Sequence, residues 1–236
     1  MTDRKTIAVL TGAGVSAESG FSTFRDSGGL WEQYDVNKVA SIEGWYADRA
    51  LVLDFYNQRR LQLRDALPNG AHKDIAALEK DYRVDVITQN VDNLHERAGS
   101  THVIHLHGEL TKVRPETGVY DRSGSEAEVI DIGYDSVRLG DLAPNGSQLR
   151  PHIVFFGEAV PKIEKAIDIV SAADILLIVG TSLQVYPAAG LYRYARPDAP
   201  IYIIDPKDVP AYDHRIRHIR AVATAGMKEF VLELQK

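Results

Sequence analysis

A glycine-rich segment near the start of the chain has the residue types and spacing of a phosphate-binding turn. Gly12, Ala13 and Gly14, with Ser16 and Ala17, form a G-x-G-x-x-A pattern directly after an apolar segment. Glycines between a strand and a helix allow a tight turn and let a phosphate approach the backbone. In an ordinary dinucleotide fold an acidic residue ends the second strand about twenty residues further on. In this sequence the next strand is expected only near residue 83. The pattern therefore predicts a dinucleotide site but disfavours a hydride-transferring dehydrogenase.

A second group of polar side chains follows residues 83–88, which we expect to form the next strand. Gln89, Asn90 and Asp92 stand close together, with His95 shortly after them. Such side chains donate and accept hydrogen bonds, as a ribose and a carboxamide require. The cluster predicts a sugar-sized binding site. The alternative is a capped helix start with Asp92 as the N-cap.

Two histidines, His105 and His107, lie at the end of a third apolar segment, 103–106. Residues two apart on a strand face the same side, so a metal pair is one alternative. No third ligand stands near them at a usual spacing, which disfavours it. Gly108 leaves the His107 imidazole at the strand end, where a neutral histidine can act as a general base near pH 7. His107 is therefore a candidate base.

These segments can form one site only if the fold brings them together at one edge of a sheet. Helices are expected at about 46–67 and, after Pro68-Asn69-Gly70, to about residue 79. Short apolar strands are expected at 6–11, 83–88, 103–106, 153–156, 174–180 and 200–204. This order predicts an α/β fold with a Rossmann-like, doubly wound, mostly parallel sheet, which binds ligands beyond the carboxyl ends of its strands. Gly180, Thr181 and Ser182 add a second glycine turn at that edge.

The regular pattern fails over residues 110–150, where glycines separate short polar pieces. We expect a small inserted module of turns and hairpins there, within a single domain over 1–236. The expected Rossmann core covers about 1–30, 68–110 and 150–236, and the small subdomain covers about 31–67 and 111–149.

Composition limits the partners and the metal chemistry. The chain has 236 residues, a net charge of -6 and no cysteine. The negative charge argues against general binding to nucleic-acid phosphates, and no apolar run is long enough to cross a bilayer. We therefore expect a cytoplasmic protein with no specific nucleic-acid or membrane partner. Without cysteines, disulfides and thiolate metal sites cannot form.

Taken together, the motifs extend over the whole chain, which resembles the sirtuins, the NAD-dependent protein lysine deacylases. The matching segments are 12–20 with 23–25, 88–95 with 98–99, 107–108, 154–158, and 180–183 with 185 and 187–189. The resemblance implies that NAD is consumed as a co-substrate and that the acyl group passes from lysine to ADP-ribose. The products would be nicotinamide, free lysine and O-acyl-ADP-ribose. Alternatives are mono-ADP-ribosyl transfer to a protein side chain and a non-catalytic NAD-sensing module.

The resemblance also implies roles for single side chains. Asp92 would hold the nicotinamide carboxamide, while Asn90 and Gln89 would orient ribose and water. His107 would deprotonate a ribose hydroxyl, so His107 and Asn90 are the implied catalytic residues. The implied NAD contacts are Gly12, Ala13, Gly14, Ser16, Phe24, Arg25, Gln89, Asn90, Asp92, Gly180, Thr181, Ser182, Asp205 and Ala223.

One pair of residues points to the acyl group. Tyr56 and Arg59 lie three apart on a predicted helix and face the same side, so a phenol hydroxyl and a guanidinium could grip one carboxylate. This resembles the Tyr-x-x-Arg pair of the sirtuins that remove succinyl, malonyl and other acidic acyl groups. Arg60 would point elsewhere. The implied substrate contacts, with the peptide added as a strand, are Tyr56, Arg59, Val154, Phe156, Gly157, Glu158 and Val185.

Two features depart from the usual sirtuin pattern. Sirtuins usually carry four zinc-binding cysteines between the catalytic histidine and the segment 156–158, and this chain has none. We expect no zinc, and apolar packing in its place by Val113, Val119, Tyr120, Val129, Ile130, Ile132 and Tyr134. Asp205 stands where the family usually has asparagine, but its carboxylate can still accept hydrogen bonds from ribose hydroxyls.

Overall fold

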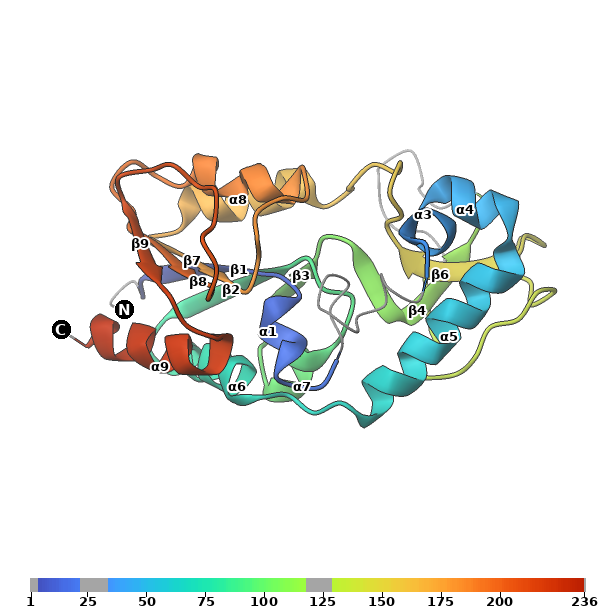
Figure 1. Cartoon of the computed structure of the whole chain (residues 1–236), viewed down its shortest axis with the longest axis horizontal. Helices are drawn as coiled ribbons and strands as arrows, with labels where there is room; N and C mark the ends of the chain where they lie inside the picture. Colours follow the sequence, from blue (N-terminus) through green and yellow to red (C-terminus); the bar gives the residue numbers. More distant parts are fainter. Residues whose placement is uncertain (1–3, 22–33, 118–128, 236) are drawn as a thin grey trace.

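The computed structural model describes residues 4–21, 34–117 and 129–235, which form one large parallel sheet and one small antiparallel sheet (Figure 1). Neighbouring strands of the large sheet all run parallel. In spatial order they are β3 (Val103–His105), β2 (Arg83–Thr88), β1 (Thr6–Thr11), β7 (Ile175–Val179), β8 (Ile201–Ile204) and β9 (Ile216–Ile219). The predicted α/β fold class is confirmed.

Helices cover both faces of the large sheet because its central strands are apolar on both sides. Ile7 and Val9 of β1 pack on one face, whereas Ala8 and Leu10 pack on the other, and all four are fully buried. The first face lies against α1 (Gly14–Ala17), α6 (Gly70–Ala77) and α9 (Ala223–Leu234) (Figure 1). The second face lies against α8 (Ile163–Ala172) and the 3-10 helix η2 (Ala188–Tyr194). None of the helices that the structure describes is both long and apolar enough to span a bilayer.

A second apolar core lies in a small subdomain at the far end of the molecule from the two chain termini (Figure 1). Trp45, Phe55, Val113 and Phe155 are among its buried residues. The helices of this subdomain are α3 (Val36–Val39), α4 (Ile42–Ala47) and α5 (Arg49–Asp65). Its sheet has the spatial order β5 (Ile130–Asp131), β4 (Gly108–Pro115) and β6 (Leu149–Ile153). β4 and β6 therefore cross the boundaries expected near residues 110 and 150.

The strand expected at 153–156 is wrong. β6 ends at Ile153 and runs antiparallel to β4 in the small sheet. The residues that follow are apolar for another reason, because Phe155 is buried in the core of the subdomain against the rings of Trp45 and Tyr56.

The single helix expected at 46–67 is also wrong, since α4 and α5 meet there. Asp48 is the N-cap of α5, and its carboxylate accepts a hydrogen bond from the Leu51 N–H at 2.9 Å. A side-chain cap of this kind starts a helix. It therefore separates α5 from α4, which ends at Ala47.

Apolar residues from the segment without cysteines lie in or beside the small-subdomain core. Val113 is fully buried, and Ile130, Ile132 and Tyr134 pack against the cluster. Val129 is half-buried. The prediction also included Val119 and Tyr120, which lie outside the described residues. Within residues 4–21, 34–117 and 129–235, no group of three or more His, Asp or Glu side chains is placed to hold a metal ion.

Candidate active site

The predicted site segments meet at the carboxyl edge of the large sheet. β1 lies between β2 and β7, so the chain builds one side of the sheet first and the other side later. Such a reversal of strand order is where open α/β sheets bind nucleotides. Residues 12–14, 89–92, 106–107 and 180–182 directly follow β1, β2, β3 and β7.

The two glycine turns form one unit, because their backbones touch. The Gly14 N–H donates to the Gly180 carbonyl oxygen at 2.9 Å, and the Gly12 N–H donates to the Val179 carbonyl oxygen at 3.1 Å. A Cβ atom on Gly14 would lie 2.7 Å from the Gly180 Cα. Gly180 has a φ of 62°, which residues with a side chain rarely adopt. Contact between the turns therefore requires these glycines, independently of any phosphate.

Asn90, Ser16 and Asp92 form a buried hydrogen-bonded cluster beside these turns. Asn90 Nδ2 donates to the Gly12 carbonyl oxygen at 3.1 Å and to Ser16 Oγ at 3.2 Å. Ser16 Oγ donates to Asp92 Oδ2 at 2.9 Å, and the Leu94 N–H donates to Asp92 Oδ1 at 3.1 Å. Burial raises the pKa of Asp92, and these hydrogen bonds oppose the shift in part. The turn after β2 is thus held against the turn after β1.

Asp92 lies one residue before the N-cap position of the following helix, and its Oδ1 accepts from the N–H of Leu94, the first residue of that helix. That helix, α7 (Leu94–Ala98), has Asn93 at its N-cap position. Gln89, on the other side of the turn, donates from Nε2 to Thr181 Oγ1 at 3.1 Å. The predicted polar cluster therefore links the ends of three strands, β1, β2 and β7.

One member of this buried cluster, His72, was not predicted from the sequence. The Asn69 N–H donates to His72 Nδ1 and closes a capping box at the start of α6. His72 Nδ1 also lies 3.1 Å from Asn69 Oδ1, and its Nε2 lies 3.4 Å from Ser16 Oγ. Burial lowers the pKa of His72 to about 4, so the ring is neutral at pH 7. The spacing of Asn69 and His72 at a helix start was the available signal, although Glu or Gln is the usual partner in a capping box.

His107 presents one ring nitrogen for proton transfer. Its Nδ1 lies 3.0 Å from the Gln89 carbonyl oxygen, which can only accept, so Nδ1 carries the proton. Nε2 of the neutral ring therefore has a lone pair. Burial lowers the pKa of His107, and the hydrogen bond to Gln89 opposes this in part, so the neutral ring predominates near pH 7. Gly108 follows with a φ of 86°, and a Cβ atom there would overlap the His152 carbonyl oxygen.

His105 makes different contacts from His107. The expectation that both lie on one strand is wrong, because β3 ends at His105. His105 is 4% exposed, with Nδ1 at 3.1 Å from the Asn90 carbonyl oxygen and Nε2 at 2.7 Å from Glu96 Oε1. Burial disfavours its charge, but the hydrogen bond and charge of Glu96, together with Glu109, outweigh this and raise the pKa of His105. In the charged form both nitrogens donate, and His105 holds the Asn90 backbone.

This ion pair predicts a pH-dependent contribution to stability that Glu96→Gln removes. The pKa of His105 is raised on folding, so its contribution is present below its ordinary value of 6.5 and is lost as the pH rises through the raised value. The pKa of Glu96 is lowered, so its contribution is present above 4.5. We expect Glu96→Gln to lower Tm by about 2–4 °C between these limits, since a half-exposed carboxylate contributes about 1 kcal/mol at most.

Thermal unfolding followed by circular dichroism from pH 5 to 9 checks this result. Glu229→Gln, at an exposed position inside α9, is the control and should track the wild type at every pH. A Tm difference for Glu96→Gln that stays constant across the range would contradict a charged His105.

The residues expected on the adenosine side lie at the same edge. Asp205 follows β8, and its Oδ1 accepts from the Lys207 N–H at 2.8 Å. Its carbonyl oxygen accepts from His218 Nε2 at 3.0 Å. Ala223 is the buried first residue of α9, and Ser182 is half-buried after β7. The Asp205 carboxylate thus stabilises its own turn beside the strand ends.

Tyr56 and Arg59 are buried together on α5, with 3% and 4% of their surface exposed. The Arg59 guanidinium lies 3.8 Å from the centre of the Phe21 ring, and its Nη1 donates to Gln62 Oε1 at 2.9 Å. Burial lowers the pKa of Arg59 to about 10, and Tyr56 and Asp92 nearby oppose the shift. Arg59 therefore lies within electrostatic reach of the turn after β2.

Arg60 points elsewhere, as expected. Its Nε donates to the Leu110 carbonyl oxygen at 2.8 Å, and its Nη1 donates to Asn57 Oδ1 at 2.7 Å. Tyr56 packs with its ring centre 5.8 Å from that of Phe155. Burial raises the pKa of Tyr56, so its hydroxyl keeps its proton and can donate to a carboxylate.

The loop after β6 connects His107 to the small subdomain. The Val154 N–H donates to the His107 carbonyl oxygen at 2.9 Å. The Phe156 N–H donates to the Ala40 carbonyl oxygen at 2.8 Å, and the Phe156 carbonyl oxygen accepts from the Ile42 N–H at 3.0 Å. Phe156 thereby pairs with the connection between α3 and α4, while its side chain is 49% exposed.

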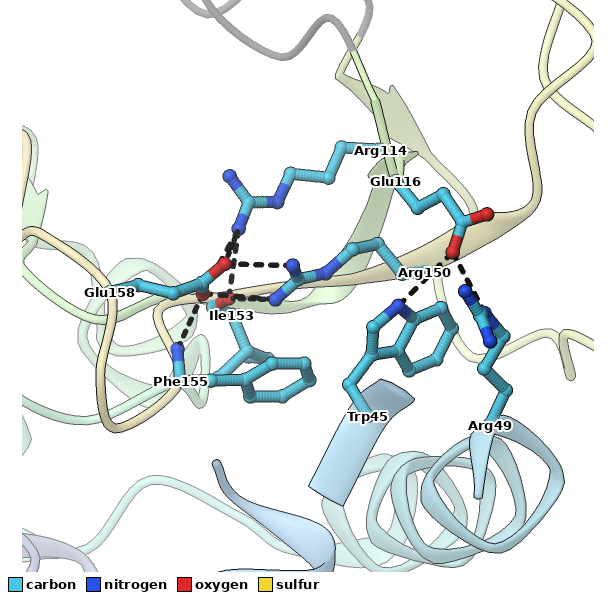
Figure 2. A network of polar contacts seen from close by, with 8 residues as sticks. All are labelled: Trp45, Arg49, Arg114, Glu116, Arg150, Ile153, Phe155 and Glu158. Carbon is cyan, nitrogen blue, oxygen red and sulfur yellow. Dashed lines mark hydrogen bonds and ion pairs between the residues drawn. The ribbon is translucent and has the colours of Figure 1, made fainter. Parts of the chain in front are cut away.

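The remaining predicted contacts are Gly157, Val185, Glu158, Phe24 and Arg25. Gly157 has a φ of 91°, and Val185 is half-buried beyond the second glycine turn. The Glu158 carboxylate lies between two arginines of the small sheet (Figure 2). Phe24 and Arg25 lie outside the described residues.

Comparison with known proteins assigns this arrangement to a family. A model of the Sir2 family matches residues 12–187, a range that includes both glycine turns, the turn after β2 and His107. This chain belongs to the Sir2 family. An NAD-dependent protein deacylase of Bacteroides thetaiotaomicron is 55% identical over 226 residues, which cover 95% of this chain and 96% of that protein. An NAD-dependent protein deacylase of Helicobacter pylori is 51% identical over 231 residues, covering 98% of this chain and 97% of the relative.

Solved structures of Sir2 homologues share the fold of this Sir2-family chain. A Sir2 homologue in complex with NAD superimposes with a TM-score of 0.83 at 36% identity, covering 98% of this chain and 90% of the other. A mutant Sir2 homologue in complex with ADP-ribose has a TM-score of 0.85 at 35% identity, covering 98% and 92%.

The side chains at the sheet edge of this Sir2-family chain fit NAD by their chemistry. Gln89, Asn90 and Asp92 offer the donors and acceptors that ribose and carboxamide groups need. A thiolate zinc site does not fit, because the chain has no cysteine to supply it.

Proposed function

We propose that this chain is an NAD-dependent protein lysine deacylase that removes succinyl and malonyl as well as acetyl groups. The observation that carries the proposal is His107, whose Nδ1 is held by Gln89 so that Nε2 is available as a base at the end of β3. The names of relatives that are 51% and 55% identical support NAD-dependent deacylation as the reaction class.

The turns at the sheet edge would hold NAD. Asp92 would contact the nicotinamide carboxamide, and Asn90 and Gln89 would contact the ribose. The Gly12–Gly14 turn and Ser182 would lie on the phosphate and adenosine side. Bound NAD would supply the ribose carbon to which the acyl-lysine carbonyl oxygen bonds as the bond to nicotinamide breaks, and a water molecule would supply the oxygen that allows free lysine to leave.

His107 would take a proton from a ribose hydroxyl onto Nε2. The imidazolium that results keeps its Nδ1 hydrogen bond to the Gln89 carbonyl oxygen, which stabilises the added charge. Base-assisted attack by a ribose hydroxyl is needed when an acyl group must be moved. Mono-ADP-ribosyl transfer has no such need, so the geometry of His107 favours deacylation.

The preference for acidic acyl groups would come from Tyr56 and Arg59. A buried phenol donor and a guanidinium can bind one carboxylate with charge-assisted hydrogen bonds. Burial disfavours the charge of Arg59, and an anionic acyl group arriving beside it would favour that charge again. Acetyl-lysine lacks the carboxylate and would not make this contact.

Nicotinamide release from NAD tests the function. One lysine peptide is offered unmodified, acetylated and succinylated, and its mass is followed with nicotinamide. We expect release that depends on the acyl group and equals the free lysine peptide formed. Nicotinamide release with a peptide that gains ADP-ribose would instead identify an ADP-ribosyltransferase. No release with any peptide would leave an NAD-sensing module.

A further inference from the structure

Glu158 is held by two arginines that stand side by side in the small sheet (Figure 2). Arg114 of β4 and Arg150 of β6 are cross-strand partners. Arg150 Nη1 and Nη2 donate to Glu158 Oε1 and Oε2 at 2.8 and 3.0 Å, and Arg114 Nη2 donates to Oε2 at 3.3 Å. Like charges directly opposite in a sheet repel, so the carboxylate between them stabilises the pair. We call Arg114, Arg150 and Glu158 the Glu158 clamp.

The Glu158 clamp also holds the backbone of the loop after β6. Both arginines donate to the Ile153 carbonyl oxygen, at 3.3 and 3.2 Å, and Glu158 Oε2 accepts from the Phe155 N–H at 2.8 Å. Three hydrogen bonds therefore hold the loop backbone at two points, Ile153 and Phe155 (Figure 2). Between these points the Val154 N–H bonds the carbonyl oxygen of His107, at the catalytic end of β3.

The Glu158 clamp is buried, so its charged groups must be desolvated and must meet in a defined geometry, which apolar packing does not require. The side chains of Arg114, Arg150 and Glu158 are 5%, 3% and 21% exposed. Buried ion pairs carry a large desolvation cost and are often no more stable than apolar residues of similar size. Their directional hydrogen bonds, however, define a backbone geometry. Arg150 also lies 4.2 Å from the centre of the Phe155 ring and 5.6 Å from that of Trp45, which holds its guanidinium in place.

We propose that the Glu158 clamp is a positioning device that sets the loop 154–157 as the wall presenting the acyl-lysine peptide to His107. Arg150 and Glu158 are its positioning residues and act through the loop backbone. The inference rests on the proposed function, because it names how that site receives its peptide. In this proposal the Glu158 carboxylate binds only groups of the protein, and the residues of loop 154–157 contact the peptide.

A matched pair of variants tests the proposal, Glu158→Gln and Glu116→Gln. Glu116 lies in the same subdomain and accepts from Arg49 Nε at 2.8 Å and Trp45 Nε1 at 3.2 Å, away from the loop (Figure 2). We expect Glu158→Gln to lower kcat/KM for the acyl peptide about 10- to 100-fold, with KM for NAD within about twofold of wild type. Glu116→Gln should lower Tm without changing either constant. The proposal would be overturned if Glu158→Gln changed KM for NAD as much as KM for the acyl peptide. It would also be overturned if Glu116→Gln lowered kcat/KM for the peptide as much as Glu158→Gln does.

A double variant separates positioning from stability. Glu158→Gln with Arg150→Met removes the closest ion pair and leaves one buried arginine, Arg114, where the single variant leaves two. Tm should therefore recover in part. Positioning requires that the peptide defect persists, because the loop is still released. Recovery of kcat/KM together with Tm would show a purely structural role.

Hydrogen exchange gives a readout that needs no activity. The amides of Val154, Phe155 and Phe156 should exchange faster in Glu158→Gln and at the wild-type rate in Glu116→Gln. Unchanged exchange would overturn the proposal even in an active enzyme. If the wild type fails to deacylate any peptide, the proposed function fails separately, and the exchange experiment still shows whether the Glu158 clamp holds the loop.

Discussion

Replacement of His107 by alanine is expected to abolish deacylation, lowering kcat/KM by a factor of about 10² to 10⁴. The reason is geometric, because Nε2 of His107 carries the lone pair at this strand end and its tautomer is set by the Gln89 carbonyl oxygen. Stability should change little, since the ring is only half-buried just beyond the end of β3. Steady-state release of the free lysine peptide, measured at saturating NAD, checks the result.

The control for this substitution is His102→Ala, an exposed histidine at the opposite end of β3, which should retain wild-type activity. The pH profile adds a second check. A general base acts when deprotonated, and burial lowers the pKa of His107. The kcat/KM of the wild type should therefore hold its plateau as the pH falls to 6.5 and decline only at lower pH, where the pH passes through the lowered pKa of His107. Deacylation by His107→Ala at the wild-type rate would show that another group is the base.

Replacement of Arg59 by methionine is expected to lower kcat/KM for a succinyl-lysine peptide about 10- to 100-fold, because a hydrogen bond to a charged group contributes about 1.5–3 kcal/mol. The acetyl peptide should be cleaved as well as before or better. Methionine fills similar space beside Phe21, and burial already disfavours the charge of Arg59, so the variant should fold. The measurement is the ratio of the two kcat/KM values on one peptide sequence, with a chelator present throughout.

Two further variants show whether the effect belongs to the pair. Tyr56→Phe keeps the ring that packs on Phe155 and removes only the hydroxyl, so it should also weaken succinyl over acetyl cleavage. Arg64→Met removes an exposed arginine from the last turn of α5 and should change neither substrate. An Arg59→Met enzyme with an unchanged ratio would show that Tyr56 and Arg59 do not read the acyl group.

The large sheet was predictable because its central strands are buried on both faces. β1 and β2 match the residues expected for them, 6–11 and 83–88, since parallel strands of this kind read as continuous apolar runs. The position of the polar residues that follow those strands, at one edge of the sheet, was therefore predictable as well. A parallel sheet brings all its carboxyl ends together.

The small subdomain was less predictable because its strands contain polar residues and its apolar residues do not all belong to strands. β6 contains Arg150 and His152, and its polar residues hide the strand from a search for apolar runs. Phe155 and Phe156 look like a strand in the sequence, yet one fills the core and the other pairs with the α3–α4 connection. Asp48 divides the predicted helix through a single local cap.

The sequence by itself determined which side chains are available for chemistry and which strand ends would bring them together, because apolar runs and glycine turns are local features. The tertiary structure alone decided which partner each polar group has. Ser16 meets Asp92 across 76 residues, and His107 meets the Gln89 carbonyl oxygen across 18. The same holds for the carboxylate of Glu158, which joins two strands of the small sheet. Hydrogen bonds act over about 3 Å, so these partners are defined only once the sheets have formed and brought distant segments into contact.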